Sequence, residues 1–367
     1  MRVVWAGSFD PDFSRNAKLA RLMAISGIQP VVIREAIWVG DRIGLAAKPS
    51  LRVAFDALYK YPRLLIRLLA AERPDAYLVS YPGWFDVPIV RLAASIKRRP
   101  LVFDPFLSLH DTVISDRQLH SPGSMAARLT RAVDKWSLRW ADLVVADTPP
   151  DLELFQELAG RLRRDGVVVP VGADDAVFVP RRDIEVEPTS VLFYGTLVPL
   201  QGVATIVEAA ALLEREGIAT TIIGDGQDRP ILHDAIQRTG ARLGLTGLVP
   251  LDELPPRIAG SAVCLGVFGD SDKAGRVVPH KLYECLAMGR PVVTRDGPGV
   301  RSLFNEGEVV IVPPADSTAL ADAIRALVED PDRRERVAAA GHSAYQHRFH
   351  EKRLAESLLQ ALQTPTD

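Results

Sequence analysis

The chain has 367 residues, of which 47% are hydrophobic and 25% charged, as in soluble globular proteins with full cores, and its length suggests two domains. A formal net charge of −2 gives no reason to expect nucleic acid as a partner, and only two cysteines, Cys264 and Cys285, leave neither a disulfide framework nor a cysteine-rich metal site. Because the first apolar run is too short for a signal peptide and no segment approaches the ~20 apolar residues of a membrane span, we expect a cytoplasmic protein.

The first half of the chain alternates apolar runs with helical stretches. Strands are predicted at residues 2–6, 30–33, 76–80, 101–104, 143–146 and 167–170, and helices at 15–26, 87–97 and 126–141. This alternation favours an α/β fold with an open, mostly parallel sheet and helices on both faces. Ligands of such folds bind beyond the carboxyl ends of the strands.

Another stretch of this half, residues 58–72, fits two interpretations. Its sequence, LYKYPRLLIRLLAAE, carries Lys60, Arg63 and Arg67 among leucines, as a helix in a membrane interface does. A core-packed helix with solvated basic residues on its outer face has the same pattern and is the favoured interpretation. A peripheral contact with the inner membrane face therefore stays open.

The second half repeats the alternation after a charged, proline-flanked linker at residues 180–188. Strands are predicted at residues 190–194, 219–223, 248–250, 262–266, 291–294 and 309–312, and helices at 203–216, 281–288, 317–328, 332–347 and 353–364. Each half begins with a strand, a glycine, a loop and a helix. We therefore predict two Rossmann-like domains facing each other across a cleft, residues 1–180 and 181–347, followed by a C-terminal helical segment, residues 348–367.

Residues 277–294, VVPHKLYECLAMGRPVVT, combine a helix start, a lone glutamate and a return strand. Pro279 suits the first turn of a helix, and Gly289 suits a left-handed stop before the strand. A helix N-terminus favours a nearby phosphate through its N–H groups and its partial positive charge. Glu284, one turn into the helix, is placed to accept hydrogen bonds from a vicinal diol such as a ribose. The segment therefore predicts half of a nucleotide-binding site.

The second half resembles family 4 retaining glycosyltransferases of the GT-B architecture. Four segments carry the resemblance in the expected order, namely VLFYGTLVPLQGVATIVEAAALL, TIIGDGQDRPIL, LTGLVPLDELPPRIAGSAVCLGV and PHKLYECLAMGRPVVT. In the first half, RWADLVVADTPPDLELF and VVPVGADDAVFVP are similar to segments before the domain linker of the same family. GSFDPDFSRN and PLVFDPFLSLHDTVISD resemble a bacterial subgroup that acts on surface or secreted glycans.

This resemblance implies a function and a division of labour between the domains. It implies a hexosyl or related transferase that moves a sugar from a nucleotide-diphosphate sugar to an acceptor hydroxyl, with retention of configuration and without a resident cofactor. The acceptor would be a glycan, a lipid-linked molecule or a small molecule. Residues 1–180 would then form the acceptor side, residues 181–347 would bind the nucleotide sugar, and the C-terminal helix would cross back to the N-terminal domain.

Three positions depart from the pattern of the family. The glutamate expected eight residues before Glu284 is Arg276, and the arginine and lysine expected in the first loop of the second domain are Thr196 and Gln201. Because negative charge grows on the leaving phosphate, some positive group must stabilise it. Our hypothesis is that Arg276 and Lys281 replace the missing pair, with Lys273 as a weaker candidate. The alternative is that these residues are solvated loop charges.

The donor side of the predicted site contains Gly195, Thr196, Gly202, Arg276, Lys281 and Glu284. Gly195 and Gly202 would let the backbone approach the phosphates, although glycines at such turns also serve packing. The resemblance places the ribose-binding carboxylate at Glu284, whereas a glutamate in a first helical turn is otherwise often exposed and favoured only by the helix dipole.

The acceptor side is predicted from residues that follow strands. The catalytic candidates are Asp104, His110 and Lys281, and the further acceptor-side candidates are Gly7, Ser8, Ser108 and Asp111. One of the residues around Asp104 would orient or deprotonate the acceptor hydroxyl, and a structural role is an equal alternative for His110. Asp10 and Asp12 resemble a metal-binding pair, but such carboxylates usually form solvated turns, so no metal is predicted.

Two alternatives to transfer remain from the sequence. A sugar-nucleotide epimerase of similar architecture would need acid–base carboxylates and histidines in the cleft. The missing glutamate and the missing arginine–lysine pair encourage the other alternative, a non-catalytic glycan-binding relative.

Overall fold

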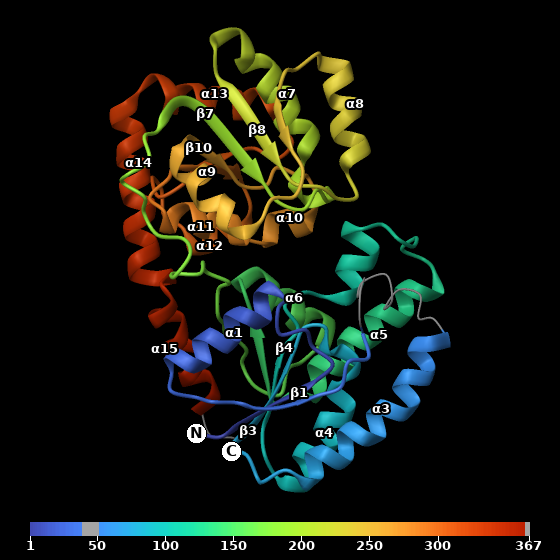
Figure 1. The fold of residues 1–367 in the computed structure, drawn as a ribbon. Coiled ribbons are helices and arrows are strands. Elements are labelled where there is room, and N and C mark those ends of the chain that lie inside the picture. Colours follow the sequence, from blue (N-terminus) through green and yellow to red (C-terminus); the bar gives the residue numbers. More distant parts are fainter. Residues whose placement is uncertain (39–50, 364–367) are drawn as a thin grey trace. The chain divides into compact units, whose positions relative to one another are not determined.

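The computed structural model describes residues 1–38 and 51–363, which form two compact units. Residues Met1–Pro170 and the segment from Lys352 onward make the first unit, and Val171–Glu351 make the second (Figure 1). Residues 171–180 and 348–351 therefore group with the second unit, whereas the sequence analysis placed them on the other side of its domain boundaries.

The first unit is built on a parallel sheet of six strands in the order β2-β1-β3-β4-β5-β6. These strands are β1 (Val3–Gly7), β2 (Val31–Arg34), β3 (Ala76–Ser80), β4 (Leu101–Asp104), β5 (Leu143–Ala146) and β6 (Val167–Val168). Every residue of β1, β3, β4 and β5 is buried, as expected of parallel strands covered on both faces. Trp5 lies opposite Val32 on one side and Leu78 on the other, so the first strand is paired on both of its edges.

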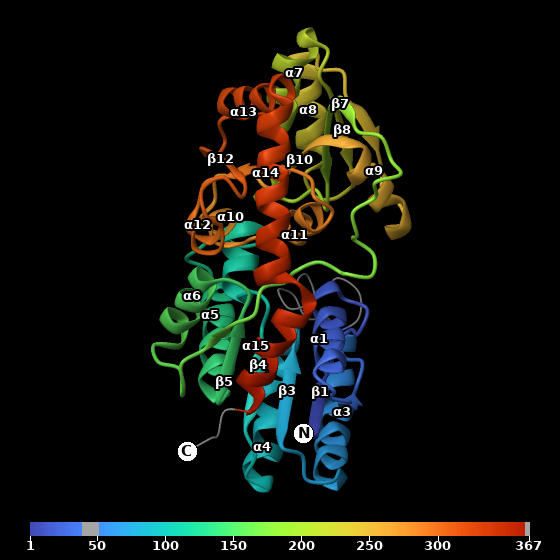
Figure 2. The same ribbon diagram turned by 90° about the vertical axis from the view of Figure 1, so that its left-hand side faces the viewer.

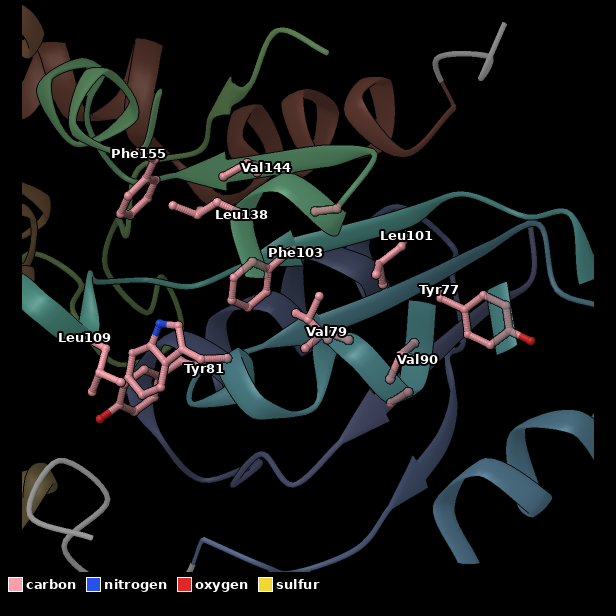
Figure 3. Close-up of a cluster of buried hydrophobic side chains, with 14 of the residues drawn as sticks. Tyr77, Val79, Tyr81, Val90, Leu101, Phe103, Leu109, Leu138, Val144 and Phe155 are labelled. Carbon is pink, nitrogen blue, oxygen red and sulfur yellow. The ribbon is translucent and has the colours of Figure 1, made fainter. Parts of the chain in front are cut away.

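Two hydrophobic clusters cover the two faces of this sheet. One contains Tyr77, Val79 and Phe103 with residues from α3 (Leu51–Ala70), α4 (Val87–Lys97), α5 (Met125–Trp140) and α6 (Pro149–Ala159) (Figure 3). The other contains Trp5 and Leu78 with residues from α1 (Ser14–Ile25) and α15 (Glu351–Gln363) (Figure 2). The C-terminal helix α15 thus packs on the first unit.

The second unit has its own six-stranded parallel sheet in the order β12-β11-β10-β7-β8-β9. Its strands are β7 (Glu187–Tyr194), β8 (Ala219–Ile223), β9 (Gly244–Thr246), β10 (Ser261–Leu265), β11 (Val292–Arg295) and β12 (Val310–Val312). Its helices are α7 (Val203–Leu213), α8 (Arg229–Thr239), α9 (Leu254–Gly260), α10 (Asp272–Arg276), α11 (His280–Ala287), α12 (Pro298–Leu303), α13 (Ser317–Glu329) and α14 (Pro331–Ala344). Apolar residues of α7, α8 and α13 pack on the face that includes Val191 and Phe193. The predicted α/β class is confirmed in both units.

Two local predictions differ from the structure. The strand expected at residues 248–250 is absent, and β9 lies a few residues earlier, because Pro250 has no N–H for a ladder and Leu248 is 78% exposed. Pro279 is the extended residue immediately before α11 rather than a residue of its first turn, with φ −74° and ψ 154°. Gly289 does adopt the predicted left-handed conformation, with φ 69°.

Candidate functional site

The loop after β7 brings the predicted Gly202 close to another backbone segment. Gly202 has φ 65°, and a Cβ there would lie 2.4 Å from the carbonyl carbon of Phe268. The same contact is held by a hydrogen bond from the Phe268 N–H to the Gln201 carbonyl, 3.0 Å long. Only glycine fits this position, and the neighbouring backbone is by itself a sufficient reason. Thr196, on the same loop, is exposed.

Lys281 lies in the first turn of α11 and is 5% exposed. Its Nζ donates to Gln201 Oε1 at 2.5 Å and to the Gly266 carbonyl at 3.2 Å, and lies 3.8 Å from the centre of the Phe193 ring. Burial lowers the pKa of Lys281 to about 7, although the negative charge of Glu284 acts in the opposite direction. The amine of Lys281 therefore gains or loses its proton close to neutral pH. It also lies beside Gly195, where a Cβ would be 3.2 Å from Nζ.

Glu284 lies one turn further along α11 and is partly buried. The Tyr194 hydroxyl, at the end of β7, donates to Glu284 Oε2 at 2.6 Å. Burial raises the pKa of Tyr194 well above its ordinary value, so the hydroxyl keeps its proton and remains a donor. The strand end thus fixes the orientation of the carboxylate predicted to receive the ribose.

Replacing Glu284 with Gln is expected to weaken the binding of a nucleoside diphosphate roughly tenfold, since a hydrogen bond to a charged acceptor is about twice as strong as a neutral one. The measurement is calorimetric titration with a nucleoside diphosphate and with its 2′,3′-dideoxy analogue. The dideoxy nucleotide should lose little affinity, because it lacks the hydroxyls that Glu284 would bind. The exposed Glu335→Gln serves as the matched control. Equal losses for both nucleotides would argue against a ribose contact.

The other predicted cations lie on the short helix α10. Arg276 is its last residue and is partly buried, whereas Lys273 is only 6% exposed. The helix begins with a cap in which Ser271 Oγ accepts from the Ala274 N–H at 3.2 Å. Neither basic residue is an ordinary solvated surface charge, which was the alternative considered from the sequence.

In the first unit, Gly7 and Ser8 follow β1 and pack against a buried carboxylate, Asp86. Asp86 Oδ2 accepts from the Ser8 N–H at 2.7 Å, and its oxygens accept from Ser8 Oγ at 2.8 Å. Gly7 has φ 129°, and a Cβ there would lie 2.6 Å from Asp86 Oδ2. Burial raises the pKa of Asp86, while hydrogen bonds from Ser8 and Tyr61 lower it. Asp86 comes shortly after β3, and this position at a carboxyl strand end is the signal that could have identified it.

A second buried carboxylate organises the loop that contains Ser108 and His110. Asp134, on α5, accepts from Ser108 Oγ at 2.6 Å, from the Leu109 N–H at 3.0 Å and from the His110 N–H at 2.8 Å. Burial raises the pKa of Asp134 to about 6, against these hydrogen bonds. The Ser108 Oγ also accepts from the Asp111 N–H at 3.0 Å, so Asp111 belongs to the same network.

The imidazole of His110 has a partner of its own. Its Nδ1 lies 3.1 Å from Thr130 Oγ1, and burial lowers its pKa below 6.5. The structure therefore brings Ser108, His110 and Asp111 together through Asp134, a residue that the sequence analysis did not single out.

Replacing Asp134 with Asn is expected to loosen this loop, because an amide has one acceptor oxygen where the carboxylate has two. The N–H groups of Leu109 and His110 should then exchange with deuterium roughly tenfold faster or more, as one or two hydrogen bonds are lost. Hydrogen–deuterium exchange with mass spectrometry measures this, with exposed Asp165→Asn as the control. Unchanged exchange in residues 108–111 would contradict the role assigned to Asp134.

Asp104 lies at the carboxyl end of β4, in a fully buried ion pair. Its Oδ2 is 2.8 Å from Arg15 Nη2 and 2.9 Å from Arg15 Nε, and both side chains have 0% exposure. Burial raises the pKa of Asp104, and Arg15 opposes this. Asp147, after β5, is a second buried carboxyl near Arg15, and burial raises its pKa well above the ordinary value. Asp104 was expected to face the acceptor, and the structure instead gives it a buried partner.

Clusters of three or more histidine, cysteine, aspartate or glutamate side chains that would hold a metal do not occur in the described ranges 1–38 and 51–363. Among the helices of these ranges, none combines the length and hydrophobicity that a membrane crossing requires.

Comparison with known proteins identifies the two halves. Residues 178–344 match the family model of glycosyl transferases group 1, and residues 23–172 match that of the glycosyl transferase 4-like domain. HepE from Anabaena, crystallised with UDP, superposes with a TM-score of 0.72 at 17% identity, covering 100% of both chains. The chain has the GT-B fold. Each half matches a glycosyltransferase family model.

Sequence relatives of this GT-B protein cover shorter stretches. Alpha-D-kanosaminyltransferase from Streptomyces kanamyceticus is 36% identical over 154 residues, which are 40% of this chain and 38% of the relative. The lipopolysaccharide core biosynthesis glycosyltransferase LpsE from Rhizobium meliloti (strain 1021) is 28% identical over 232 residues, 61% of this chain and 65% of the relative. The chain thus spans less than two thirds of either relative. The predicted GT-B fold is confirmed, and Lys281 and Glu284 lie in the segment that matches the group 1 model.

Proposed function

We propose that the protein is a family 4 retaining glycosyltransferase that transfers a sugar from a nucleotide-diphosphate sugar to an acceptor hydroxyl. The nucleotide sugar is a co-substrate, and no resident cofactor takes part. The observation that carries the proposal is the buried amine of Lys281 at the start of α11, one turn before Glu284, inside a glycosyltransferase group 1 domain. HepE, a structural neighbour, was crystallised with UDP, which supports a uridine nucleotide as the first probe.

The chemistry follows from the charge that develops during transfer. As the bond to the sugar breaks, negative charge grows on the leaving diphosphate, and the Lys281 ammonium and the N–H groups at the start of α11 stabilise it. Glu284 accepts hydrogen bonds from the ribose and so fixes the nucleotide. The departing phosphate takes the proton of the acceptor hydroxyl on the same face, which gives retention without a strong base.

The contact between Gln201 and Lys281 supports this assignment. Gln201 stands near the place where the family carries a loop cation, and its Oε1 accepts from Lys281 Nζ. A lysine at position 201 would put a second positive charge beside a buried amine, which lowers the pKa of both. The neutral Gln201 instead accepts a hydrogen bond from Lys281 and orients it. The amine of Lys281 then takes the place of the cation that the family carries in this loop.

The acceptor and the location are part of the same proposal. The match to an enzyme of lipopolysaccharide core biosynthesis supports a surface or secreted glycan, free or lipid-linked, as the acceptor. The protein would then work in the cytoplasm, with a peripheral contact at the inner membrane face. The side chains around Ser8, Ser108 and Asp111 in the first unit would contribute to the acceptor side, whereas Arg276 would contribute its charge on the donor side and Asp104 would stay in its buried pair with Arg15.

Incubation with a panel of UDP-, GDP- and ADP-sugars tests the proposal. Release of a nucleoside diphosphate, by hydrolysis or by transfer to added glycan fragments, is the expected result. An isomerised nucleotide sugar would indicate the epimerase, and binding without turnover would indicate a glycan-binding relative. The matched family models and the two relatives are glycosyltransferases, which favours transfer over epimerisation.

A further inference from the structure

Two adjoining cavities on the first unit share a wall made by Trp136 and Trp140, whose ring centres are 5.9 Å apart. One cavity, of about 370 Å³, lies between α5 and the segment that leads into α4. Its lining is apolar and includes Trp84, Phe85, Pro88, Leu129 and Val133. The other cavity, of about 560 Å³, is lined by Arg139, Arg161, Arg163 and Arg164 together with Asp142. An apolar compartment thus adjoins a cationic one.

The cationic compartment has an excess of positive charge. Its single lining carboxylate, Asp142, is already engaged by Arg91 at 2.6 Å and by the Leu101 N–H at 2.9 Å. Arg163 lies 3.6 Å from the same carboxylate and is 47% exposed, and Arg161 is exposed. Guanidinium groups bind phosphate oxygens through paired hydrogen bonds, so this compartment suits a phosphate.

The outer surface of α5, like the two cavities, has an apolar part and a basic part side by side. Met125, Leu129 and Trp136 are 75%, 64% and 51% exposed and follow one side of the helix. The exposed basic residues of α5 are Arg128, Arg131, Lys135 and Arg139. The single acidic residue of this helix, Asp134, is buried and bonded to the 108–110 loop. An apolar stripe beside a purely basic one is the pattern of a helix that lies in a membrane interface.

Neighbouring helices on this side of the sheet add exposed apolar side chains. On α3, Phe55, Leu58, Tyr59 and Ile66 are 71%, 75%, 71% and 66% exposed. On α4, Leu92 and Ile96 are 47% and 58% exposed. These residues lie on the layer of helices that covers one face of the first sheet (Figure 1). Apolar side chains gathered on one layer indicate a binding surface more than scattered ones do.

We propose that this α4–α5 face binds an anionic phospholipid of a membrane surface. The phosphate lies among the arginines of the larger cavity, and an acyl chain lies in the apolar cavity beyond the two tryptophans. Charge complementarity selects this occupant: bulky apolar side chains suit hydrocarbon, and the adjoining guanidinium groups suit an anionic head group. The inference rests on the peripheral membrane contact in the proposed function and gives it a site and a lipid class.

Vesicle flotation of the full chain tests the proposal, with vesicles of phosphatidylcholine alone and of phosphatidylcholine mixed with phosphatidylglycerol. The protein should float with the mixed vesicles and much less with the neutral ones, and added salt should weaken the binding. Equal partition onto both vesicles, or no flotation with either, would overturn the anionic lipid site. If inorganic phosphate saturated the arginine-lined cavity and flotation did not change, the anionic lipid site would also be overturned.

Substitutions assign the binding to the two cavities. Leu129→Gln and Arg161→Glu should each lower partition onto the mixed vesicles, the charge reversal by roughly tenfold or more. The matched controls are Leu248→Gln and Arg215→Glu, whose parent residues are exposed in the second unit, and they should partition like the wild type. Equal loss in variants and controls would contradict the site, as would an oligomer that dissociates in Leu129→Gln.

The outcome is independent of sugar transfer. UDP affinity and nucleoside diphosphate release should be unchanged in Leu129→Gln and Arg161→Glu, which also shows that both variants fold. Loss of flotation with intact turnover would support the lipid site. Intact flotation of a protein that releases no nucleoside diphosphate would leave the lipid site standing and remove the proposed transferase function.

Discussion

The affinity for UDP is expected to fall as the pH rises above about 7. Burial holds the pKa of Lys281 at about 7 in the protein without nucleotide. A bound diphosphate favours the charged amine and raises this pKa, so binding takes up a proton. Above pH 7 the apparent affinity should fall by nearly tenfold per pH unit, until the pH reaches the raised pKa of Lys281 in the complex. Calorimetric titration with UDP at pH values from about 6 to about 9, on both sides of the Lys281 pKa of about 7, measures this change in affinity.

Two substitutions separate the charge of Lys281 from its packing. Lys281→Arg keeps a cation throughout this pH range, so its affinity should vary little with pH. Lys281→Met fills the buried space without charge and should bind UDP at least tenfold more weakly at pH 7, about 1.4 kcal/mol, again with a flat profile. Exposed Lys352→Met is the control and should behave as the wild type. A wild-type affinity that does not change with pH, or an unaltered affinity in Lys281→Met, would refute the role.

Replacing Arg15 with Met is expected to lower the free energy of unfolding by about 3–5 kcal/mol, the usual cost of leaving a buried charge without its partner. Arg15 pairs with Asp104 at 2.8 Å inside the first unit, and its Nη1 donates to the Val169 carbonyl at 2.9 Å. Without the guanidinium, Asp104 and Asp147 would both stay buried without the cation that now opposes the rise of their pKa values.

The pH dependence of this loss has a definite sign. Burial already raises the pKa of Asp104 above 3.8, and removing Arg15 raises it further. The folded variant therefore binds protons more tightly than the unfolded chain does, and it loses stability as the pH rises. Urea unfolding at pH 5 and pH 8 should show the larger deficit at pH 8. Exposed Arg128→Met should cost less than about 0.5 kcal/mol at either pH. If Arg15→Met lowered the free energy of unfolding as little as Arg128→Met does, the buried pair of Arg15 and Asp104 would not have the stabilising role assigned to it.

The sequence predicted the strands of the first sheet best where they are buried on both sides. The apolar runs at residues 76–80, 101–104 and 143–146 coincide with β3, β4 and β5, because a covered parallel strand needs hydrophobic residues at every position. An edge strand has no such requirement. β9 consists of Gly244–Thr246, with Leu245 47% exposed, so no apolar run marks it, and the more hydrophobic residues 248–250 misled the prediction.

The candidate site was predictable where its residues are local. Lys281 and Glu284 lie in the same helix, α11. The residues that mark its two ends, Pro279 and Gly289, are close by in the sequence. The partners of Lys281 and Glu284 are not. Gln201 is 80 residues from Lys281, and Tyr194 is 90 residues from Glu284. Arg15 is 89 residues from Asp104, and without this contact a carboxylate at a strand end looked available to an acceptor. Such pairings depend on the tertiary fold, which local spacing does not encode.

A crystal structure of the protein with UDP tests the central claim most directly, because it locates the diphosphate and the ribose. The account predicts a diphosphate oxygen within hydrogen-bond distance of Lys281 Nζ, at the start of α11, and a ribose hydroxyl donating to the Glu284 carboxylate. A nucleotide bound elsewhere, with Lys281 Nζ still donating to Gln201 and the Gly266 carbonyl, would contradict it.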